Sequence, residues 1–301
     1  MEKLKYAVLT TIISLIAVVL VSPAVAQQRY FIKAEVLAET LGAPNIRIVD
    51  CRRSLEAYEE GHIPGAVYLN VFKKLRVSGK SGVSGVRRML EEQEDIFGRE
   101  LGINNHSMVI LYDDTGLDAT RLFWELSYAG HENVALLYGG WTEWTKKKLP
   151  VSKETPKVVP QPFICNCNCN VLATANYILA NLGNPNVVIV DCRPPEEFLG
   201  KKKHPKAKIA GRIPGSVNGY ALMNWENKTY PKPPEELLGE FEDLGVTRDK
   251  TVVVYCNSGY MGANSWFILK VLGYPNVRCY DFSWFEWSQK DHLPKVIGQG
   301  S

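Results

Sequence analysis

The 301-residue sequence has little excess charge and, beyond its first 26 residues, no long hydrophobic run. With 35 Lys and Arg against 32 Asp and Glu, its formal net charge is only +3, which does not indicate nucleic acid or an anionic membrane surface as a partner. The lack of a second long apolar run leaves no further candidate for a membrane-spanning helix. The remaining composition, 46% hydrophobic and 22% charged, is typical of a soluble globular protein long enough for two domains.

Residues for metal or triad chemistry are also scarce. The five histidines show neither the spacing of metal ligands nor a Ser-His-Asp arrangement. The paired CxxC motifs of structural zinc sites are absent. We therefore expect no structural zinc site and no serine-triad hydrolase.

The N-terminal segment has the three parts of a secretory signal. Lys3 and Lys5 supply positive charge, an apolar run extends from Val8 to Val21, and Ala24-Val25-Ala26 forms a small-x-small cleavage site. We predict that residues 1–26 are removed and that the mature protein is exported to the periplasm or another extracytoplasmic space, without stable membrane insertion. A retained membrane anchor is the alternative interpretation.

Predicted strands and helices alternate along the rest of the chain. This alternation predicts an α/β fold, in which parallel sheets are covered by helices on both faces. Strands are expected at 45–52, 108–113, 134–140, 186–193 and 251–255, and helices at 31–41, 86–101, 119–130 and 264–273. The basic, Gly- and Ser-rich stretch Phe72–Gly82 is expected to be an exposed loop.

The second half of the chain repeats the first. NVVIVDCR at 186–193 repeats NIRIVDCR 141 positions earlier, and LGVTRDKTVVVYCN at 244–257 aligns without gaps on a segment 143 positions earlier. The second offset still holds at Trp284-Phe285-Glu286-Trp287, so the repeat indicates two copies of one domain. We predict a first domain at 27–148, a linker at 149–162, a second domain at 163–295 and a tail at 296–301.

Cys256 occupies a position in the second copy that suits sulfur chemistry. It follows the strand at 251–255 and precedes an uncharged loop. That loop consists of Asn257, Ser258, Gly259, Tyr260 and Met261. At the carboxyl end of a parallel strand, such a loop can direct several N–H groups and a helix N-terminus at one sulfur, which favours the reactive thiolate. We predict Cys256 as the nucleophile and the loop as its substrate-binding element.

The repeat separates Cys256 from its counterpart in the first copy. Cys256 aligns with Asp113, which cannot act as a sulfur nucleophile, while the loop glycine is kept as Gly116 and Gly259. The first domain is therefore expected to be catalytically inactive. Without the repeat, a buried cysteine acting as a small hydrophobe would be the simpler interpretation.

A set of short motifs follows the two copies in a fixed order. They are VDCR, GHIPGA, VILYD, Ala119-x-Arg121, Ala129-Gly130-His131 and LYGGWTEW in the first copy, and VDCR, GRIPGS, VVVYC and YDFSWFEW in the second. With these motifs the sequence resembles the tandem-domain rhodanese family of sulfurtransferases over nearly all of residues 29–293. The resemblance implies two rhodanese-like domains, each a central parallel sheet flanked by helices, and a persulfide on Cys256. It also implies that no metal or organic cofactor is needed.

Some positions depart from that family. Members specialised for thiosulfate usually carry basic residues in the loop after the cysteine, whereas this loop has none, and Glu197 lies near the place of a family arginine. Arg212, and Lys201 in the basic stretch at 201–208, are candidates to contact a charged substrate, with a solvated surface loop as the alternative. Gly262 stands where a phosphatase loop needs an arginine, so phosphatase chemistry is not indicated.

Three further cysteines alternate with asparagine near the start of the second domain. On a strand, Cys165, Cys167 and Cys169 would point to one face, where they could bind a soft metal or exchange disulfides. An edge strand with small buried thiols or a disulfide is the alternative. The chain has seven cysteines, so at least one stays unpaired if all disulfides are intramolecular, and Cys256 fits that role.

The sequence thus predicts an exported sulfurtransferase. It would move sulfane sulfur from a donor such as thiosulfate or 3-mercaptopyruvate to a thiophilic acceptor such as cyanide or a thiol, through a Cys256 persulfide. We expect a monomer that acts on small molecules and, as a further partner, an exported thiol protein. Two other classes stay open: a non-enzymatic sulfur carrier or protein-binding module, and an exported thiol oxidoreductase with the Cys165–Cys169 run as its resolving partner.

Overall fold

The computed structural model describes residues 29–78 and 84–298. The predicted signal segment lies outside these residues. Within them, no helix is long and apolar enough to cross a membrane.

The first domain is built on a five-stranded parallel sheet. Its strands are β1 (Phe31–Ile32), β2 (Ile46–Asp50), β3 (Val67–Tyr68), β6 (Met108–Tyr112) and β7 (Val134–Leu137). They lie in the order β1-β7-β6-β2-β3. The central strands β2 and β6 are apolar and largely buried because helices cover both faces of the sheet.

The second domain repeats this sheet. Its strands are β8 (Leu172–Ala173), β9 (Val187–Asp191), β10 (Val217–Asn218), β13 (Thr251–Tyr255) and β14 (Val277–Tyr280). They lie in the order β10-β9-β13-β14-β8, which is the order of the first sheet when each strand is replaced by its counterpart. The central pairs also share their register, with Tyr255 opposite Asp191 as Tyr112 is opposite Asp50. The predicted duplication of one α/β domain is therefore confirmed.

Helices cover both faces of each sheet. The first domain has α2 (Ala34–Glu39), α3 (Leu55–Glu60), α4 (Val71–Lys74), α5 (Leu90–Glu94), a π-helical turn (Asp95–Glu100), α6 (Asp118–Tyr128) and α7 (Gly140–Lys146). The second has α8 (Ala175–Ala180), α9 (Pro195–Phe198), α10 (Pro234–Asp243), α11 (Tyr260–Val271) and α12 (Ser283–Gln289), with the small antiparallel pair β11 (Trp225–Glu226) and β12 (Tyr230–Pro231).

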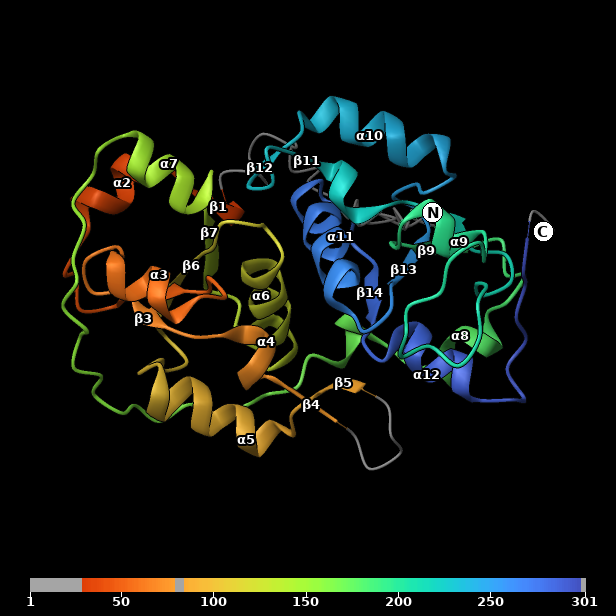
Figure 1. Cartoon of the computed structure of the whole chain (residues 1–301), viewed down its shortest axis with the longest axis horizontal. Coiled ribbons are helices and arrows are strands. Elements are labelled where there is room, and N and C mark those ends of the chain that lie inside the picture. The colour runs from red at the N-terminus through yellow and green to blue at the C-terminus, as the bar shows by residue number, and fades with distance from the viewer. Residues whose placement is uncertain (1–28, 79–83, 299–301) are drawn as a thin grey trace, which may run out of the picture.

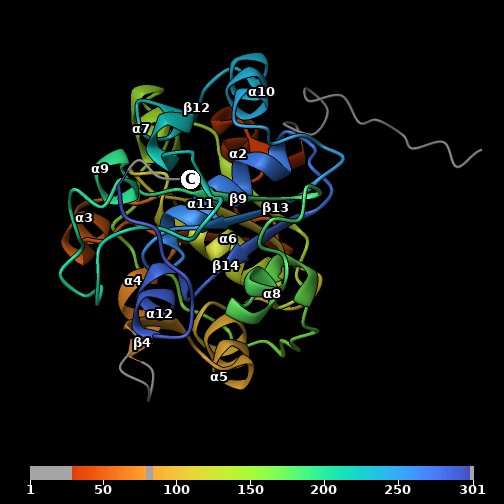
Figure 2. The ribbon, with the colours of Figure 1, turned by 90° about the vertical axis from the view of Figure 1, so that its right-hand side faces the viewer.

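The two domains share one hydrophobic core. Figure 1 shows α6 and α11 lying next to each other between the two sheets, while Figure 2, seen from the second domain, shows α8 and α12 on the outer side. Phe123 of α6 and Phe267 of α11 pack edge to face with ring centroids 4.9 Å apart. Both belong to a single cluster of buried residues that includes the centres of both sheets. The burial of α6 and α11 on this shared face holds the domains together.

The described part of the stretch Phe72–Gly82, predicted as an exposed loop, contains regular secondary structure. Asn70 accepts a hydrogen bond from the Lys73 amide at 2.9 Å and so caps α4. After α4 the chain forms β4 (Arg76–Ser78), which pairs antiparallel with β5 (Ser84–Arg87). The loop prediction was wrong here because the capping residue precedes the stretch and the pairing partner follows it.

Two predicted helix boundaries in the first domain also differ. The predicted helix at 31–41 begins with β1, since Phe31 and Ile32 pair with Leu136 and Leu137 of β7. The predicted helix at 86–101 begins only at Leu90, because the preceding residues belong to β5. In both cases pairing with a distant or neighbouring strand replaces the local helical preference.

The strand expected for the cysteine run is absent. Cys165 to Asn168 form neither helix nor strand, and Cys169 begins a short 3₁₀ turn that ends at Val171. The amides of Asn166 and Asn168 donate instead to the carbonyl oxygens of Ala129 and Tyr128 at the end of α6. The three side chains therefore do not share a strand face.

Candidate active site

Cys256 lies where β13 ends and the chain turns into α11. The residue is buried, with 3% of its surface exposed. Gly259 precedes the helix with a left-handed backbone of φ 78°, a conformation that glycine adopts without steric cost. Helix α11 therefore begins at Tyr260, earlier than the predicted start at Asn264, and Tyr260 and Met261 belong to its first turn.

The first turn of α12 holds the Cys256 peptide in place. The Cys256 amide donates to the Ser283 hydroxyl at 3.0 Å, and that hydroxyl donates to the Tyr280 carbonyl at 2.6 Å. The amides of Trp284 and Phe285 donate to the carbonyl oxygens of Cys256 and Asn257, both at 3.0 Å. Since these carbonyls are bound by α12, the loop backbone around the cysteine has little freedom to rotate.

The first domain shows what the same loop does to an anion. Asp113, at the position of Cys256, is buried, and its carboxylate accepts hydrogen bonds from three loop amides. They come from Gly116 at 2.8 Å, Asp118 at 2.9 Å and Ala119 at 3.0 Å. The loop thus forms an anion-binding nest of backbone N–H groups.

The repeat places the equivalent loop after Cys256 in the second domain. At the offset of 143 positions, the three donors correspond to Gly259, Met261 and Gly262. Burial raises the pKa of Asp113 to about 6, against the effect of the Ala119 and Gly116 amides, which favour its charged form. Amides at the equivalent positions of the Cys256 loop would favour a negative charge on the sulfur in the same way, while burial opposes it.

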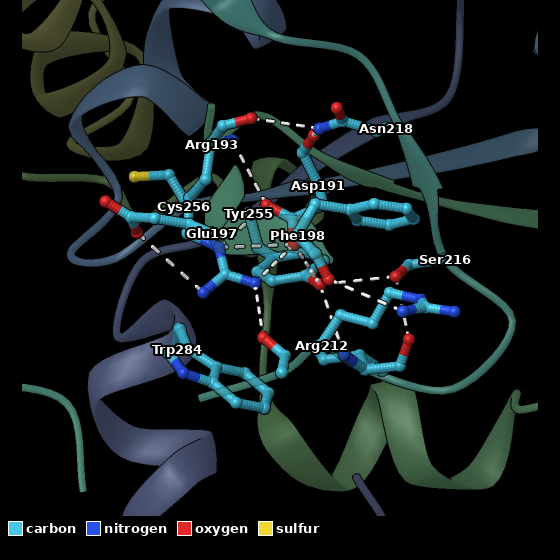
Figure 3. A network of polar contacts seen from close by, with 12 residues as sticks. Asp191, Arg193, Glu197, Phe198, Arg212, Ser216, Asn218, Tyr255, Cys256 and Trp284 are labelled. Atoms are coloured by element: carbon cyan, nitrogen blue, oxygen red, sulfur yellow. Dashed lines mark hydrogen bonds and ion pairs between the residues drawn. The ribbon is translucent and has the colours of Figure 1, made fainter. Parts of the chain in front are cut away.

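A polar network connects β9, β13 and the GRIPG turn next to the cysteine. Figure 3 shows Arg193 against Asp191, with Nη2 to Oδ2 at 2.5 Å and Nε to Oδ1 at 2.9 Å. The same guanidinium donates to the Gly211 carbonyl at 2.8 Å, and the Tyr255 hydroxyl donates to Asp191 at 2.6 Å.

The first domain has the same network with matching distances. Arg52 binds Asp50 and the Gly61 carbonyl, and the Tyr112 hydroxyl donates to Asp50 at 2.6 Å. Because the network occurs in both copies, the DxR and GxIPG motifs hold the carboxyl end of each sheet together and do not by themselves mark the reactive copy.

Arginines of the first domain bind the Cys256 loop. Arg76 donates to the Ser258 carbonyl, and Arg121 of α6 donates to the Gly259 carbonyl at 3.2 Å. Both guanidinium groups also pair with Asp281, which follows β14, at 2.8 Å and 2.7 Å. Although burial opposes it, Arg121, Arg76 and Arg87 hold the pKa of Asp281 below its usual range.

Two further contacts join α11 to the first domain. The Tyr260 hydroxyl donates to Asp118 at 3.2 Å, and the side-chain Nδ2 of Asn264 donates to the Gly116 carbonyl at 2.8 Å. Burial, followed by the charge of Asp118, raises the pKa of Tyr260 well above its usual value, so the phenol stays neutral. Because these contacts join the two loops directly, the geometry of the Cys256 loop depends on the first domain.

Sequence reasoning identified the loop but not these supporting residues. Arg121 belongs to a motif shared with the family, and Arg76 lies in the stretch predicted as a loop. Neither had a visible partner in the sequence, since Asp281 is 205 positions away from Arg76. The motif Ala119-x-Arg121 was the signal in the sequence for Arg121, and no motif pointed to Arg76.

Arg212 and Lys201, the two residues predicted to contact a charged substrate, lie at different places in the second domain. The Arg212 guanidinium stacks on the Phe198 ring, 4.5 Å from its centroid, and donates to the carbonyls of Phe198 and Gly298. Figure 3 shows it across the Asp191–Arg193 pair from Cys256. Lys201 is exposed in the basic stretch. A substrate contact of either residue stays a prediction.

The remaining cysteines have different surroundings. All seven are free thiols in this structure. Cys51, Cys192 and Cys279 are fully buried, and burial raises the pKa of each well above its usual value, which makes them poor nucleophiles. Within the described ranges 29–78 and 84–298, no group of three or more His, Cys, Asp or Glu side chains is arranged to hold a metal ion.

The fold and the site together define a tandem α/β protein with a cysteine loop at the carboxyl end of one central sheet. A family model described as "Rhodanese-like domain" matches residues 33–147 and again 174–290. Thiosulfate sulfurtransferase of Azotobacter vinelandii is 33% identical over 259 residues, covering 86% of this chain and 93% of the relative.

Two other relatives align over similar lengths. The sulfur carrier protein TtuD of Thermus thermophilus is 32% identical over 291 residues, covering 91% and 99% of the two chains. A probable 3-mercaptopyruvate sulfurtransferase of Pseudomonas aeruginosa is 31% identical over 277 residues, covering 88% and 97%. The chain therefore belongs to the rhodanese-like family, and with two tandem domains of that family it is a sulfurtransferase.

Solved structures with the same fold are less similar to this chain in sequence. A complex of EanB with ergothioneine superposes with a TM-score of 0.81 at 23% identity, over 92% of this chain and 72% of EanB. The crystal structure of YnjE superposes with a TM-score of 0.82 at 21% identity, over 91% and 69%. These likenesses show the fold alone.

Proposed function

We propose that the protein carries sulfane sulfur as a persulfide on Cys256, and that the first domain has no such role. The supporting observation is the Asp113 nest, in which the first-domain loop directs three amides at a carboxylate in the position of the cysteine. The second-domain loop keeps the left-handed glycine and the helix start that form this nest.

The chemistry follows from the loop. The Cys256 thiolate attacks the sulfane sulfur of a donor, the donor's bond to that sulfur breaks, and the electron pair leaves with the donor remnant. The loop amides and the N-terminus of α11 stabilise both the thiolate and the persulfide anion. A thiophilic acceptor such as cyanide or a thiol then removes the outer sulfur and restores the thiolate.

Small donors such as thiosulfate and 3-mercaptopyruvate are the first candidates, since relatives are named for their transfer. A second candidate function is that of a non-enzymatic sulfur carrier. The uncharged loop favours it, as does the similarity to a protein named a sulfur carrier. Turnover of small donors separates the two functions, because a carrier accepts one sulfur and releases it only to a partner protein.

Replacing Cys256 by Ser tests the proposal. The hydroxyl keeps the shape but is a far weaker nucleophile, so we expect turnover to fall at least about 1,000-fold while the fold is kept. Mass spectrometry of the wild type after treatment with thiosulfate, 3-mercaptopyruvate and a persulfide should show one added sulfur on the Cys256 peptide. Full activity of the Ser variant, or sulfur found mainly on Cys192 or Cys279, contradicts the proposal.

Export and partners are part of the same proposal. The residues that motivate export, Lys3, Lys5 and Ala24-Val25-Ala26, predict a mature N-terminus at Gln27. Intact-mass analysis of the extracytoplasmic fraction tests this, and a full-length mass in the membrane fraction contradicts it. We further propose a monomer that exchanges sulfur with small molecules and with an exported thiol protein.

A further inference from the structure

The Cys256 loop has a carboxylate at its edge. Glu197 belongs to the short helix α9, and its Oε2 accepts a hydrogen bond from the Asn257 side-chain amide at 2.8 Å. Figure 3 shows the carboxylate on the same side of the network as the cysteine sulfur. The Glu197 side chain is 17% exposed, so solvent and a bound molecule can reach it.

The neighbouring guanidinium does not neutralise this charge. Arg193 Nη1 lies 4.0 Å from Glu197, but Arg193 is buried and already makes two-point contact with Asp191. One cation among two carboxylates leaves a net charge of about −1. The Asn257 side chain, which donates to Glu197, is itself uncharged and has a buried Oδ1 without a hydrogen-bond partner among the described residues.

The cations on the other side of the loop are committed elsewhere. Arg76 and Arg121 bind loop carbonyls and Asp281, and their side chains are at most 3% exposed. Arg53 is half-exposed, but it pairs with Asp118 at 2.8 Å. The loop residues from Asn257 to Met261 carry no charge. A substrate that approaches Cys256 along α9 therefore meets the partly exposed carboxylate of Glu197.

We propose that this site selects sulfur donors that carry an ammonium or another N–H group close to the transferable sulfur, and that Glu197 is the residue that contacts this group. A dianion such as thiosulfate is repelled by the same carboxylate. The inference depends on the proposed function, since Cys256 must be the sulfur acceptor.

The donor class that fits is a persulfide of a small aminothiol. The Cys256 thiolate attacks the outer sulfur of R–S–SH, the S–S bond breaks, and the electron pair leaves as R–S⁻, which later takes a proton from water. The enzyme keeps the outer sulfur and its proton as Cys256–S–SH. Atoms and charge balance without an oxidant, a reductant or a metal.

Two donors of equal length test this selection. Cysteamine persulfide places an ammonium two carbons from its inner sulfur, and the persulfide of 3-mercaptopropionate places a carboxylate at the same carbon. The measured quantity is the ratio of their single-turnover rates of Cys256 persulfidation, followed by mass spectrometry. We expect the wild type to favour the cationic donor about 10-fold or more.

Glu197→Gln removes the charge and keeps an oxygen that accepts the Asn257 hydrogen bond. We expect the donor ratio to fall about 10-fold in this variant and its rate with thiosulfate to rise. Glu196→Gln is the matched control, because Glu196 is exposed on the same helix. It removes the same net charge and should leave the ratio unchanged. The ratio is taken within one protein sample, so it does not depend on the folded fraction.

The outcomes are distinguishable. If both persulfides label Cys256 at equal rates, or if Glu196→Gln changes the ratio as much as Glu197→Gln, the selection by Glu197 is wrong while the proposed function stands. If no donor places sulfur on Cys256, the proposed function fails and the selection fails with it.

Discussion

At the scale of single residues, the two copies differ by the group placed inside the same loop. In the first domain the group is the carboxylate of Asp113, which satisfies three buried amides. In the second it is the sulfur of Cys256, which is larger and can form a covalent bond to another sulfur. The duplication has thus kept the anion-binding shape of the loop and changed the chemistry of the group that it surrounds.

Replacing Asp113 by Ala tests the structural role of the first-domain loop. The amides of Gly116, Asp118 and Ala119 lose their acceptor, so we expect a loss of about 2–4 kcal/mol in the free energy of unfolding. Urea denaturation measures it. Asp114→Ala is the control, since Asp114 is exposed next to it and should cost under about 0.5 kcal/mol. Equal losses of unfolding free energy for Asp113→Ala and Asp114→Ala would contradict the anion-binding nest around Asp113.

At the scale of elements, the reactive loop depends on how α11 begins. Gly259 turns the chain with φ 78° and lies so close to Asp281 that an added Cβ would be 2.6 Å from its carbonyl oxygen. The first copy has the same arrangement at Gly116, with φ 71° and the Lys228 carbonyl in the way. The left-handed glycine allows the helix to start directly after the cysteine loop.

Gly259→Ala should therefore damage both stability and activity. The left-handed conformation and the close carbonyl together predict a loss of about 2–4 kcal/mol in the free energy of unfolding, with persulfidation slowed because the loop amides must move. Gly239→Ala serves as the control. Gly239 lies inside α10 with open space around it, so alanine should stabilise the protein by about 0.5–1 kcal/mol. If Gly259→Ala and Gly239→Ala changed the free energy of unfolding in the same direction, backbone strain at Gly259 would not be the cause of the loss.

At the scale of the whole molecule, the first domain takes part in the site without carrying the reactive group. Asp281 of the second domain is buried among Arg76, Arg87 and Arg121 of the first. Two of these arginines also bind carbonyls of the Cys256 loop. The charge cluster therefore links domain packing to the geometry of the loop.

Asp281→Asn tests this link through its pH dependence. Removing one partner of a buried ion pair costs about 3–5 kcal/mol, so we expect a loss of that size at pH 7. The folded-state pKa of Asp281 is lowered, so its contribution is complete above the unfolded-state pKa of about 3.9 and is lost as the pH falls below it. The stability difference between wild type and variant, from urea unfolding between pH 3 and 8, should be constant above about pH 5 and should begin to narrow below about pH 4.

The exposed pair of Asp291 with Lys208 supplies the control for this experiment. Asp291→Asn should leave the stability nearly unchanged at every pH, because surface ion pairs contribute little. A constant difference between wild type and Asp281→Asn across the whole pH range would mean that the carboxylate charge is not what joins the domains.

The sequence by itself determined the α/β class, the two copies and the position of Cys256. The apolar runs of β2, β6, β9 and β13 identify central strands because burial on both faces requires it. The constant offset then aligns Asp113 with Cys256 and shows which copy has the thiol. These inferences depend on residues that are close along the chain or on repetition, and both are visible in one sequence.

Only the tertiary structure decided which side chains surround the loop. Arg76 meets Asp281 across 205 positions, and Glu197 meets Asn257 across 60. The hairpin of β4 and β5 and the early start of α11 likewise depend on partners that local patterns do not reveal. Pairing at such separations follows from how the two sheets pack through α6 and α11, and a single sequence holds no record of that packing.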